Sequence, residues 1–122
     1  MVIALWCVLI AAVLPYIAAA IAKARSDFDN ASPRDWLAKQ EGFRRRANAA
    51  QSNGFEVFPL FAVAVVVAMT IHHAPQHKVD MLAVGFVVAR LAYLGFYLAN
   101  LAMLRSIAWT AGMVCAITIF VA

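Results

Sequence analysis

The sequence predicts an all-α integral membrane protein, a four-helix bundle with four transmembrane helices in one domain, residues 1–122. Of the 122 residues, 66% are hydrophobic and 13% are charged, and the mean hydropathy is +0.83. Soluble domains are typically about half apolar and about one quarter charged. A chain of this length buries only about 60–70% of its surface on folding, so the surplus apolar side chains require contact with lipid.

The apolar residues gather in four stretches, each long enough to cross a bilayer. The predicted spans lie at about residues 2–23, 44–72, 80–104 and 105–122. A transmembrane helix needs roughly 20 residues, within a range of about 17–25. The fourth stretch reaches this length when Arg105 and Ser106 form its first turn at the membrane interface. The connections are short and leave no room for a second domain.

The first stretch admits two interpretations, a transmembrane helix or a cleaved signal peptide. The small residues Ala18–Ala20 are weakly typical of a cleavage site. A signal peptide, however, carries basic residues ahead of an apolar core of about 7–15 residues. Here Lys23 and Arg25 follow the apolar run, and no basic residue precedes it. This pattern favours a retained helix.

The basic residues predict the orientation of the chain in the membrane. Seven of the ten Lys and Arg residues lie in the first connection or at the span ends that adjoin it, whereas only Lys78 lies between the second and third spans. The seven are Lys23, Arg25, Arg34, Lys39, Arg44, Arg45 and Arg46. Connections rich in Lys and Arg stay in the cytoplasm, so both termini are expected on the outer face. The net charge of +4 follows from this anchoring, and binding of nucleic acid is not expected.

The first connection is the only sizeable polar segment. Ser32 as an N-cap, Pro33 at the first helical position and Asp35 in the first turn predict a short helix, which Gly42 would end. Trp36 would then lie among the lipid headgroups. The alternative, a solvated connecting loop, is the interpretation we favour from sequence.

Histidines and cysteines give weak signals. His72, His73 and His77 lie in "TIHHAPQHK" without Cys or acidic partners in a zinc-binding pattern, so we expect an interfacial turn and no metal site. Cys7 and Cys115 lie within apolar spans, where a free cysteine behaves as a small hydrophobic residue.

Two polar stripes run through the second and third spans. In the second span, four residues lie at relative positions 0, 3, 7 and 10. At 3.6 residues per turn they fall within an arc of roughly 80° on one side of the helix, and the third span repeats this spacing. The stripes are Arg46, Ala49, Asn53 and Glu56 in the second span, and Arg90, Tyr93, Tyr97 and Asn100 in the third.

The depth of two charged residues predicts an ion pair. Glu56 lies about 15 Å beyond Arg46, and Arg90 about 20 Å before Arg105, at 1.5 Å per residue. Both charges should therefore lie near the middle of the membrane, where an isolated charge costs at least about 2.5–3.5 kcal/mol. We expect Glu56 and Arg90 to pair, within one subunit or across an interface. Such a pair also admits a purely structural role in fixing helix register.

Toward the cytoplasm the two stripes predict a wet, positively charged mouth. Its expected members are Arg46, Asn53, Tyr93, Tyr97, Asn100 and Arg105. A pocket of this kind suits a small anion with several hydrogen-bonding groups, and the neighbouring lipid suits an apolar second substrate.

These residues resemble the MAPEG superfamily, the membrane-associated proteins in eicosanoid and glutathione metabolism. The resemblance covers nearly the whole chain and is strongest in "RRANAAQSNGFEVFPLF" (44–61) and "ARLAYLGFYLANLAMLRSIAW" (89–109). The "SPRDW" segment is similar to the bacterial branch. It is the order Asn-x-x-Glu, Phe-Pro, Arg-x-x-Tyr-x-x-x-Tyr and a later Arg-Ser that is specific.

The resemblance implies a homotrimer with glutathione bound as co-substrate between subunits near the cytoplasmic side. With the orientation predicted from the basic residues, we expect it in a bacterial inner membrane with its termini on the periplasmic face. The resemblance also implies that Asn53 and Glu56 hold the peptide, and that a neighbouring subunit contributes the tyrosines and the arginine that stabilises the thiolate. Tyr93, Tyr97 and Arg105 match that second group, and Ser106 matches a serine implicated in some members of the family.

One departure from the family pattern concerns the arginines that precede the asparagine. Where several eukaryotic enzymes of the family have Arg, this chain has Ala49 and Ser52. Arg46, one turn earlier, is the residue that could replace them in binding a glutathione carboxylate.

Three functions remain open from sequence. The leading hypothesis is a glutathione-dependent transferase or peroxidase, acting on a small lipophilic electrophile or a lipid hydroperoxide. The second is a lipid-binding scaffold of the same fold without catalysis. The third is a small proton-coupled drug exporter, which the positive charges of Arg90 and Arg105 disfavour because they would repel a cationic substrate.

Overall fold

The computed structural model describes residues 2–122, and within them every regular element is a helix. Four of these helices are long and apolar enough to cross a membrane: α1 (Ile3–Lys23), α3 (Gly42–Thr70), α4 (Gln76–Leu98) and α5 (Ala102–Val121). A fifth, short helix, α2 (Pro33–Ala38), lies in the first connection. The all-helical membrane fold predicted from composition is therefore confirmed.

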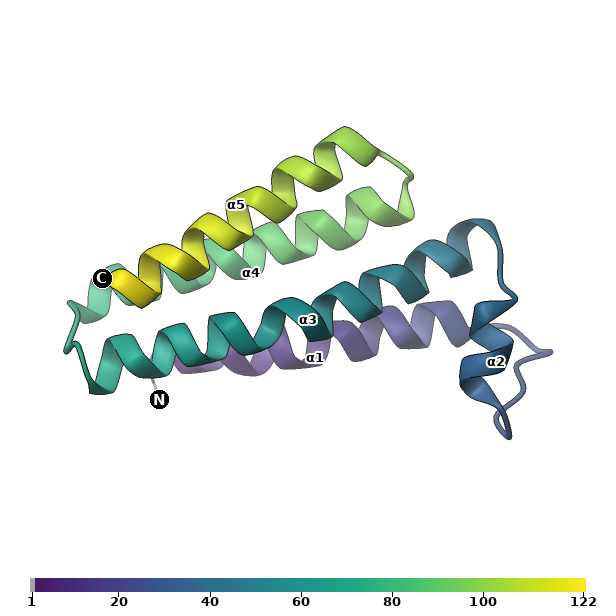
Figure 1. The fold of residues 1–122 in the computed structure, drawn as a ribbon, viewed down its shortest axis with the longest axis horizontal. Coiled ribbons are helices and arrows are strands. Elements are labelled where there is room, and N and C mark those ends of the chain that lie inside the picture. Colours follow the sequence, from purple (N-terminus) through teal and green to yellow (C-terminus); the bar gives the residue numbers. More distant parts are fainter. Residues whose placement is uncertain (1) are drawn as a thin grey trace.

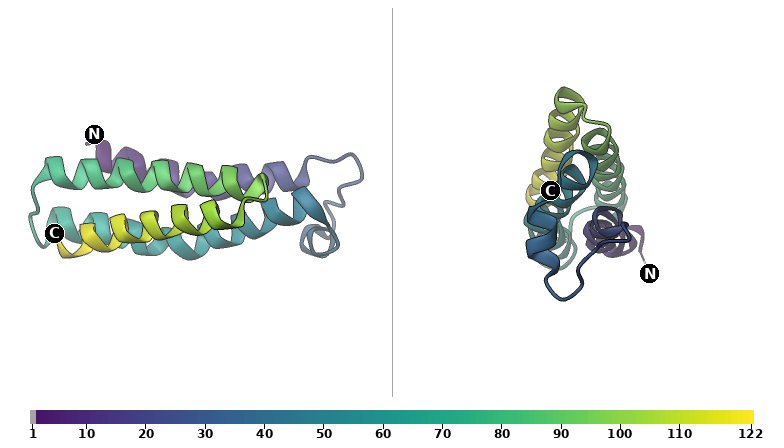
Figure 2. Two further views of the ribbon diagram at one scale, coloured as in Figure 1. Left: turned by 90° about the horizontal axis from the view of Figure 1, so that it is seen from above. Right: turned by 90° about the vertical axis from the view of Figure 1, so that its right-hand side faces the viewer.

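The long helices form two antiparallel pairs that pack on one another. α1 lies beside α3, and α4 beside α5, as Figure 1 shows. Both termini lie at the end of the bundle that carries the α3–α4 turn, while α2 and the α4–α5 turn lie at the opposite end (Figures 1 and 2). In Figure 1 the two pairs diverge toward the α2 end.

Small side chains allow the helices to approach closely. The main core near the terminal end contains buried alanines from all four long helices, including Ala4, Ala64, Ala83 and Ala116. At its centre the rings of Phe61 and Phe86 stack, with centroids 3.9 Å apart. Apolar side chains gain little from leaving lipid, so this close packing has to supply most of the attraction between helices.

Toward the α2 end the core divides into two smaller clusters. One lies under α2, where Leu37 packs against Ala22 of α1 and Ala47 of α3. The other centres on Tyr93, which packs against Ala50 of α3 and Ala108 of α5. The second cluster is the foundation of the candidate site.

The first connection is more ordered than the solvated loop that we favoured. Its helix α2 begins at Pro33, with Ser32 in the N-cap position but without a side-chain cap bond. The prediction that Gly42 ends α2 is wrong. Gly42 begins α3, with a positive φ of 61°. The helix α2 forms because Leu37 is buried against α1 and α3. The polar composition of the segment gave no indication of this burial.

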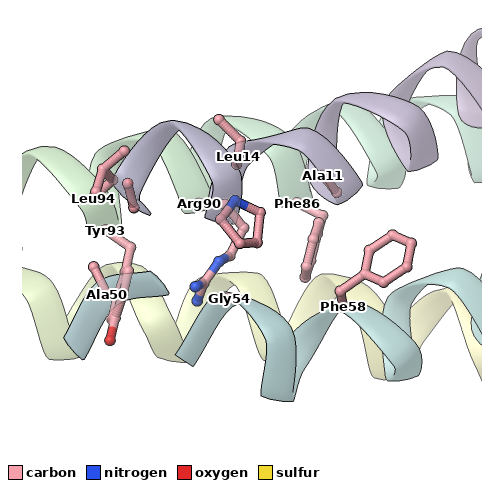
Figure 3. A pocket seen from close by; sticks show the side chains of 11 residues that line it. Ala11, Leu14, Ala50, Gly54, Phe58, Phe86, Arg90, Tyr93 and Leu94 are labelled. Carbon is pink, nitrogen blue, oxygen red and sulfur yellow. The ribbon is translucent and has the colours of Figure 1, made fainter. Parts of the chain in front are cut away.

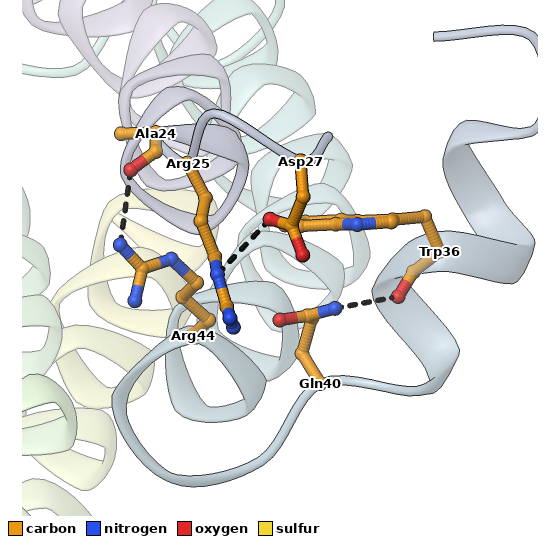
Figure 4. A network of polar contacts seen from close by, with 6 residues as sticks. All are labelled: Ala24, Arg25, Asp27, Trp36, Gln40 and Arg44. Carbon is orange, nitrogen blue, oxygen red and sulfur yellow. Dashed lines mark hydrogen bonds and ion pairs between the residues drawn. The ribbon is translucent and has the colours of Figure 1, made fainter. Parts of the chain in front are cut away.

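Three consecutive arginines at the start of α3 have three different partners. Arg44 donates to the carbonyl of Ala24 at the end of α1 over 2.9 Å, as Figure 4 shows. Arg45 pairs with Glu41 at 3.4 Å. Arg46 donates to the carbonyl of Leu98 at the end of α4 over 3.2 Å. Arg44 and Arg46 thus bind carbonyl groups that helix ends leave unpaired.

At the opposite end, Asp80 of α4 caps α1. Its Oδ1 accepts hydrogen bonds from the backbone N–H of Ala4, at 2.9 Å, and from Nε2 of Gln76, at 2.8 Å. The first N–H groups of a helix have no partner of their own, so Asp80 supplies one from another helix.

Asp80→Ala is expected to lower the free energy of unfolding by about 1 kcal/mol, the usual cost of losing an N-cap. Thermal unfolding in detergent, followed by circular dichroism, measures the change. Asp29→Ala is the matched control, because Asp29 accepts only from Ala31 in an exposed local turn. Equal effects of the two substitutions would contradict the interhelical cap.

Candidate functional site

Four side chains from α4 and α5 form a stack that runs from the core toward the end of the bundle that carries α2 (Figure 1). The guanidinium carbon of Arg90 lies 4.2 Å from the centroid of the Tyr93 ring. The rings of Tyr93 and Tyr97 meet edge to face at 5.6 Å and 88°. The guanidinium carbon of Arg105 lies 4.4 Å from the Tyr97 centroid. We call Arg90, Tyr93, Tyr97 and Arg105 the Arg–Tyr stack.

The spacing of the residues explains the stack. Positions 90, 93 and 97 are three and four apart, so they share one face of α4. Arg105 joins them because the chain reverses over residues 99–101 and places the first turn of α5 beside the last turn of α4. α4 therefore ends at Leu98, earlier than the predicted residue 104.

Asn100 makes the reversal possible. Its φ of 62° lies in the left-handed region, where asparagine is tolerated better than most residues. Its backbone N–H donates to the carbonyl of Tyr97, and the next N–H, of Leu101, donates to that of Phe96. Asn100 lines a small pocket together with Tyr97 and Arg105, two other residues predicted at the mouth. Its backbone conformation also shapes the turn that leads to Arg105.

Asn100→Gly is expected to keep or slightly raise stability, because glycine adopts a positive φ without strain. Asn100→Val should lower the free energy of unfolding by about 1–2 kcal/mol, the usual cost of a left-handed conformation. Thermal unfolding of the two variants measures this difference. If glycine destabilised the protein as much as valine, the Asn100 side chain would be the important feature.

Arg90 is buried where three other helices meet α4. It is 8% exposed, and its Nη1 has no hydrogen-bond partner among residues 2–122. Its aliphatic part passes Gly112 of α5, and its side chain extends toward Gly54 of α3 (Figure 3). A cavity of about 20 Å³, which Pro15 of α1 also lines, lies beside it.

The ion pair predicted between Glu56 and Arg90 is not formed within the subunit. Glu56 lies on an exposed part of α3, and the ion pairs of the described chain, residues 2–122, do not include it. Helical periodicity placed both residues at similar depth, but α3 is rotated so that Gly54 and Val57 face the bundle instead. A pair across a subunit interface remains a prediction.

The other residues predicted on α3 lie at its edge. Asn53 is half-buried, and its Oδ1 finds no partner within residues 2–122. Arg46 is partly engaged through Leu98, and its Nε is buried without a partner in the described part of the chain. The structure thus brings Arg90, Tyr93 and Arg105 together but leaves the two α3 side chains at the edge.

A wider pocket opens next to Arg105 on the outer face of α5. It has a volume of about 230 Å³, and its walls are Tyr93, Arg105, Ser106, Trp109 and Thr110. Ser106 is exposed there, while the Thr110 hydroxyl donates to the Ser106 carbonyl at 2.9 Å. The site therefore combines the Arg105 cation with a partly apolar opening on the exposed face of α5.

Comparison with known proteins decides the family. The model described as the MAPEG family matches residues 3–122. The chain belongs to the MAPEG family. No curated protein and no solved structure matches it.

In this MAPEG chain the pocket also includes Trp109 and Thr110, which were not predicted as site residues. Both line the pocket with Ser106, to which they are related by three and four residues. That helical spacing was visible in the sequence, but nothing in the apolar span around them marked them as site residues. MAPEG membership is consistent with a membrane protein linked to glutathione or eicosanoid metabolism.

Proposed function

We propose that this MAPEG protein is a glutathione-dependent membrane transferase or peroxidase. The observation that carries the proposal is the guanidinium of Arg105, which lies over the Tyr97 ring beside an open pocket on α5. A thiol of ordinary pKa, about 8.5, ionises more readily beside a guanidinium, and the thiolate is the reactive nucleophile.

The residues around the stack fit the chemistry of glutathione. Asn53 Oδ1, Arg46 Nε and Arg90 Nη1 are buried without partners within residues 2–122. Glutathione carries two carboxylates that accept from guanidinium groups, and amide and ammonium donors that suit the Asn53 oxygen and the Glu56 carboxylate. In the proposed complex Asn53 and Glu56 bind the peptide, while Arg105 and Ser106 act at the thiol.

A homotrimer completes the proposed site. Glu56 is exposed on α3, and Ser106 and Trp109 are exposed on α5. In the proposed assembly the α3 face of one subunit meets the α4–α5 face of the next. The α2 end faces the cytoplasm of a bacterial cell, the termini face the periplasm, and lipophilic substrates enter from the bilayer. Native mass spectrometry in detergent measures the number of subunits.

Glutathione titration and conjugation test the function together. Calorimetry should detect binding at millimolar glutathione, and the purified protein should join glutathione to an activated aryl chloride. In that reaction the sulfur–carbon bond forms as chloride leaves with the electron pair of the carbon–chlorine bond. With a lipid hydroperoxide, two glutathione molecules would give the alcohol, water and glutathione disulfide. Absence of binding and of both reactions would refute the proposal.

A second candidate function is lipid binding without catalysis. The bond between Arg46 and the Leu98 carbonyl favours it, because this is the arginine expected to replace the missing ones at Ala49 and Ser52. Retained lipid in native mass spectra, with no heat of glutathione binding, would select this function.

A further inference from the structure

Tyr97 offers Arg105 the face of its ring, and this contact is the starting point of the inference. Among residues 2–122, the Arg105 side chain has no ion pair, and its guanidinium carbon lies 4.4 Å from the centroid of the Tyr97 ring. Attraction between a cation and an aromatic face uses no hydrogen-bond acceptor. The N–H donors of Arg105 are therefore left for an anionic ligand.

The ring of Tyr97 is itself held in place. Tyr93 meets it edge to face at 88°, a preferred arrangement for aromatic pairs. Tyr93 is only 5% exposed, and Arg90, at 8%, covers its other side. The Arg–Tyr stack therefore connects the half-buried Arg105 to the packed interior through three successive contacts.

The tyrosine hydroxyls take no part in this arrangement. Neither the Tyr93 nor the Tyr97 hydroxyl forms a hydrogen bond within residues 2–122, whereas each ring contacts a guanidinium and the other ring. The resemblance to MAPEG proteins implies that these tyrosines contribute to the glutathione site. The geometry of this chain separates the contribution of the ring from that of the hydroxyl.

We propose that Tyr97 is a positioning residue, which acts through the face of its ring to hold the Arg105 guanidinium at the thiol site. Tyr93 and Arg90 fix the orientation of that ring. The inference rests on the proposed glutathione function, and it assigns Tyr97 a role that phenylalanine can perform and an aliphatic residue cannot.

The test compares Tyr97→Phe with Tyr97→Leu. The ultraviolet absorbance of bound thiolate is titrated against pH in the wild type and in both variants. Tyr97→Phe should keep the wild-type pKa of the bound thiol. Tyr97→Leu should raise this pKa by about one unit, a tenfold loss of thiolate, and should lower kcat more than it raises KM. Wild-type behaviour of Tyr97→Leu, or equal losses in both variants, would overturn the inference.

A second measurement does not depend on glutathione. Nuclear magnetic resonance relaxation of the Arg105 Nε–H reports how rigid the side chain is, with exposed Arg34 of α2 as the mobile reference. Arg105 should be ordered in the wild type and in Tyr97→Phe, and mobile in Tyr97→Leu. If Tyr97→Leu does not fold, Tyr97→Met replaces it, because methionine fills a similar volume without a ring.

The two measurements separate the possible failures. A wild type that binds no glutathione refutes the proposed function and the thiol site, even where Arg105 is ordered in the wild type and in Tyr97→Phe but mobile in Tyr97→Leu, a result that would show only that the ring holds the guanidinium. An Arg105 that is equally mobile in all variants refutes the positioning role, whatever glutathione does.

Discussion

Arg105→Ala should lower kcat for glutathione conjugation about 100-fold, the usual effect of removing one preorganised group that stabilises a developing or bound anion. The guanidinium sits over Tyr97 at the edge of the pocket, without an ion-pair partner in residues 2–122. Its positive charge favours the thiolate, so its removal returns the bound thiol toward the pKa of a free thiol, about 8.5. Stopped-flow measurement of conjugation at saturating glutathione gives the change.

The pH dependence distinguishes this mechanism from simple loss of binding. Because the thiol pKa rises in Arg105→Ala, the fraction of thiolate at neutral pH falls, and activity should recover as the pH rises through about 8.5. Arg34→Ala is the control, since Arg34 lies exposed on α2, away from the stack. Unchanged kcat in Arg105→Ala, or an equal loss in Arg34→Ala, would remove the role assigned to Arg105.

Gly54→Ala is expected to lower the free energy of unfolding by about 1–3 kcal/mol, the usual range for overpacking a tight core. A Cβ at position 54 would lie 2.7 Å from Cγ and 3.2 Å from Cβ of Pro15. The proline ring is closed on the backbone, so it cannot rotate away, and α1 and α3 would have to separate. Thermal unfolding in detergent measures the loss.

Glycine 95 provides the matched control for that substitution. A Cβ at Gly95 would meet no atom within 4 Å, and this glycine also lies inside a helix. Gly95→Ala should therefore be neutral or stabilising by up to about 1 kcal/mol, because alanine favours helix more than glycine does. The double variant Pro15→Ala, Gly54→Ala should regain part of the loss. Equal effects at positions 54 and 95 would show that close packing is not the cause.

The number and type of long helices could be predicted from the sequence, but the end of α4 could not. Hydropathy identifies each span because the membrane requires about 20 apolar residues in sequence. The same signal continues without a break from Leu98 to Leu104, so it does not reveal the reversal there. Asn100, whose side chain tolerates a positive φ, was the available clue.

The α4 residues of the Arg–Tyr stack could also be predicted from the sequence, whereas the contacts between helices around the stack could not. Spacing places Arg90, Tyr93 and Tyr97 on one face of α4 without any tertiary information. The rotation of α3 about its own axis depends on close packing of Gly54 against Pro15, so Glu56 could not be placed relative to Arg90. The partner of Arg46 is a backbone carbonyl, which no pattern of side chains can indicate.

The bonds at the two ends of the bundle have a consequence for assembly during synthesis. Asp80, which caps α1, and the Leu98 carbonyl, which binds Arg46, both belong to α4. When only α1 and α3 have been synthesised, Arg44 can already bind the Ala24 carbonyl. The first turn of α1 and the Arg46 side chain still lack their hydrogen-bond partners on α4. Insertion of α4 therefore completes polar contacts at both ends of the bundle, and a chain stopped before α4 lacks both of them.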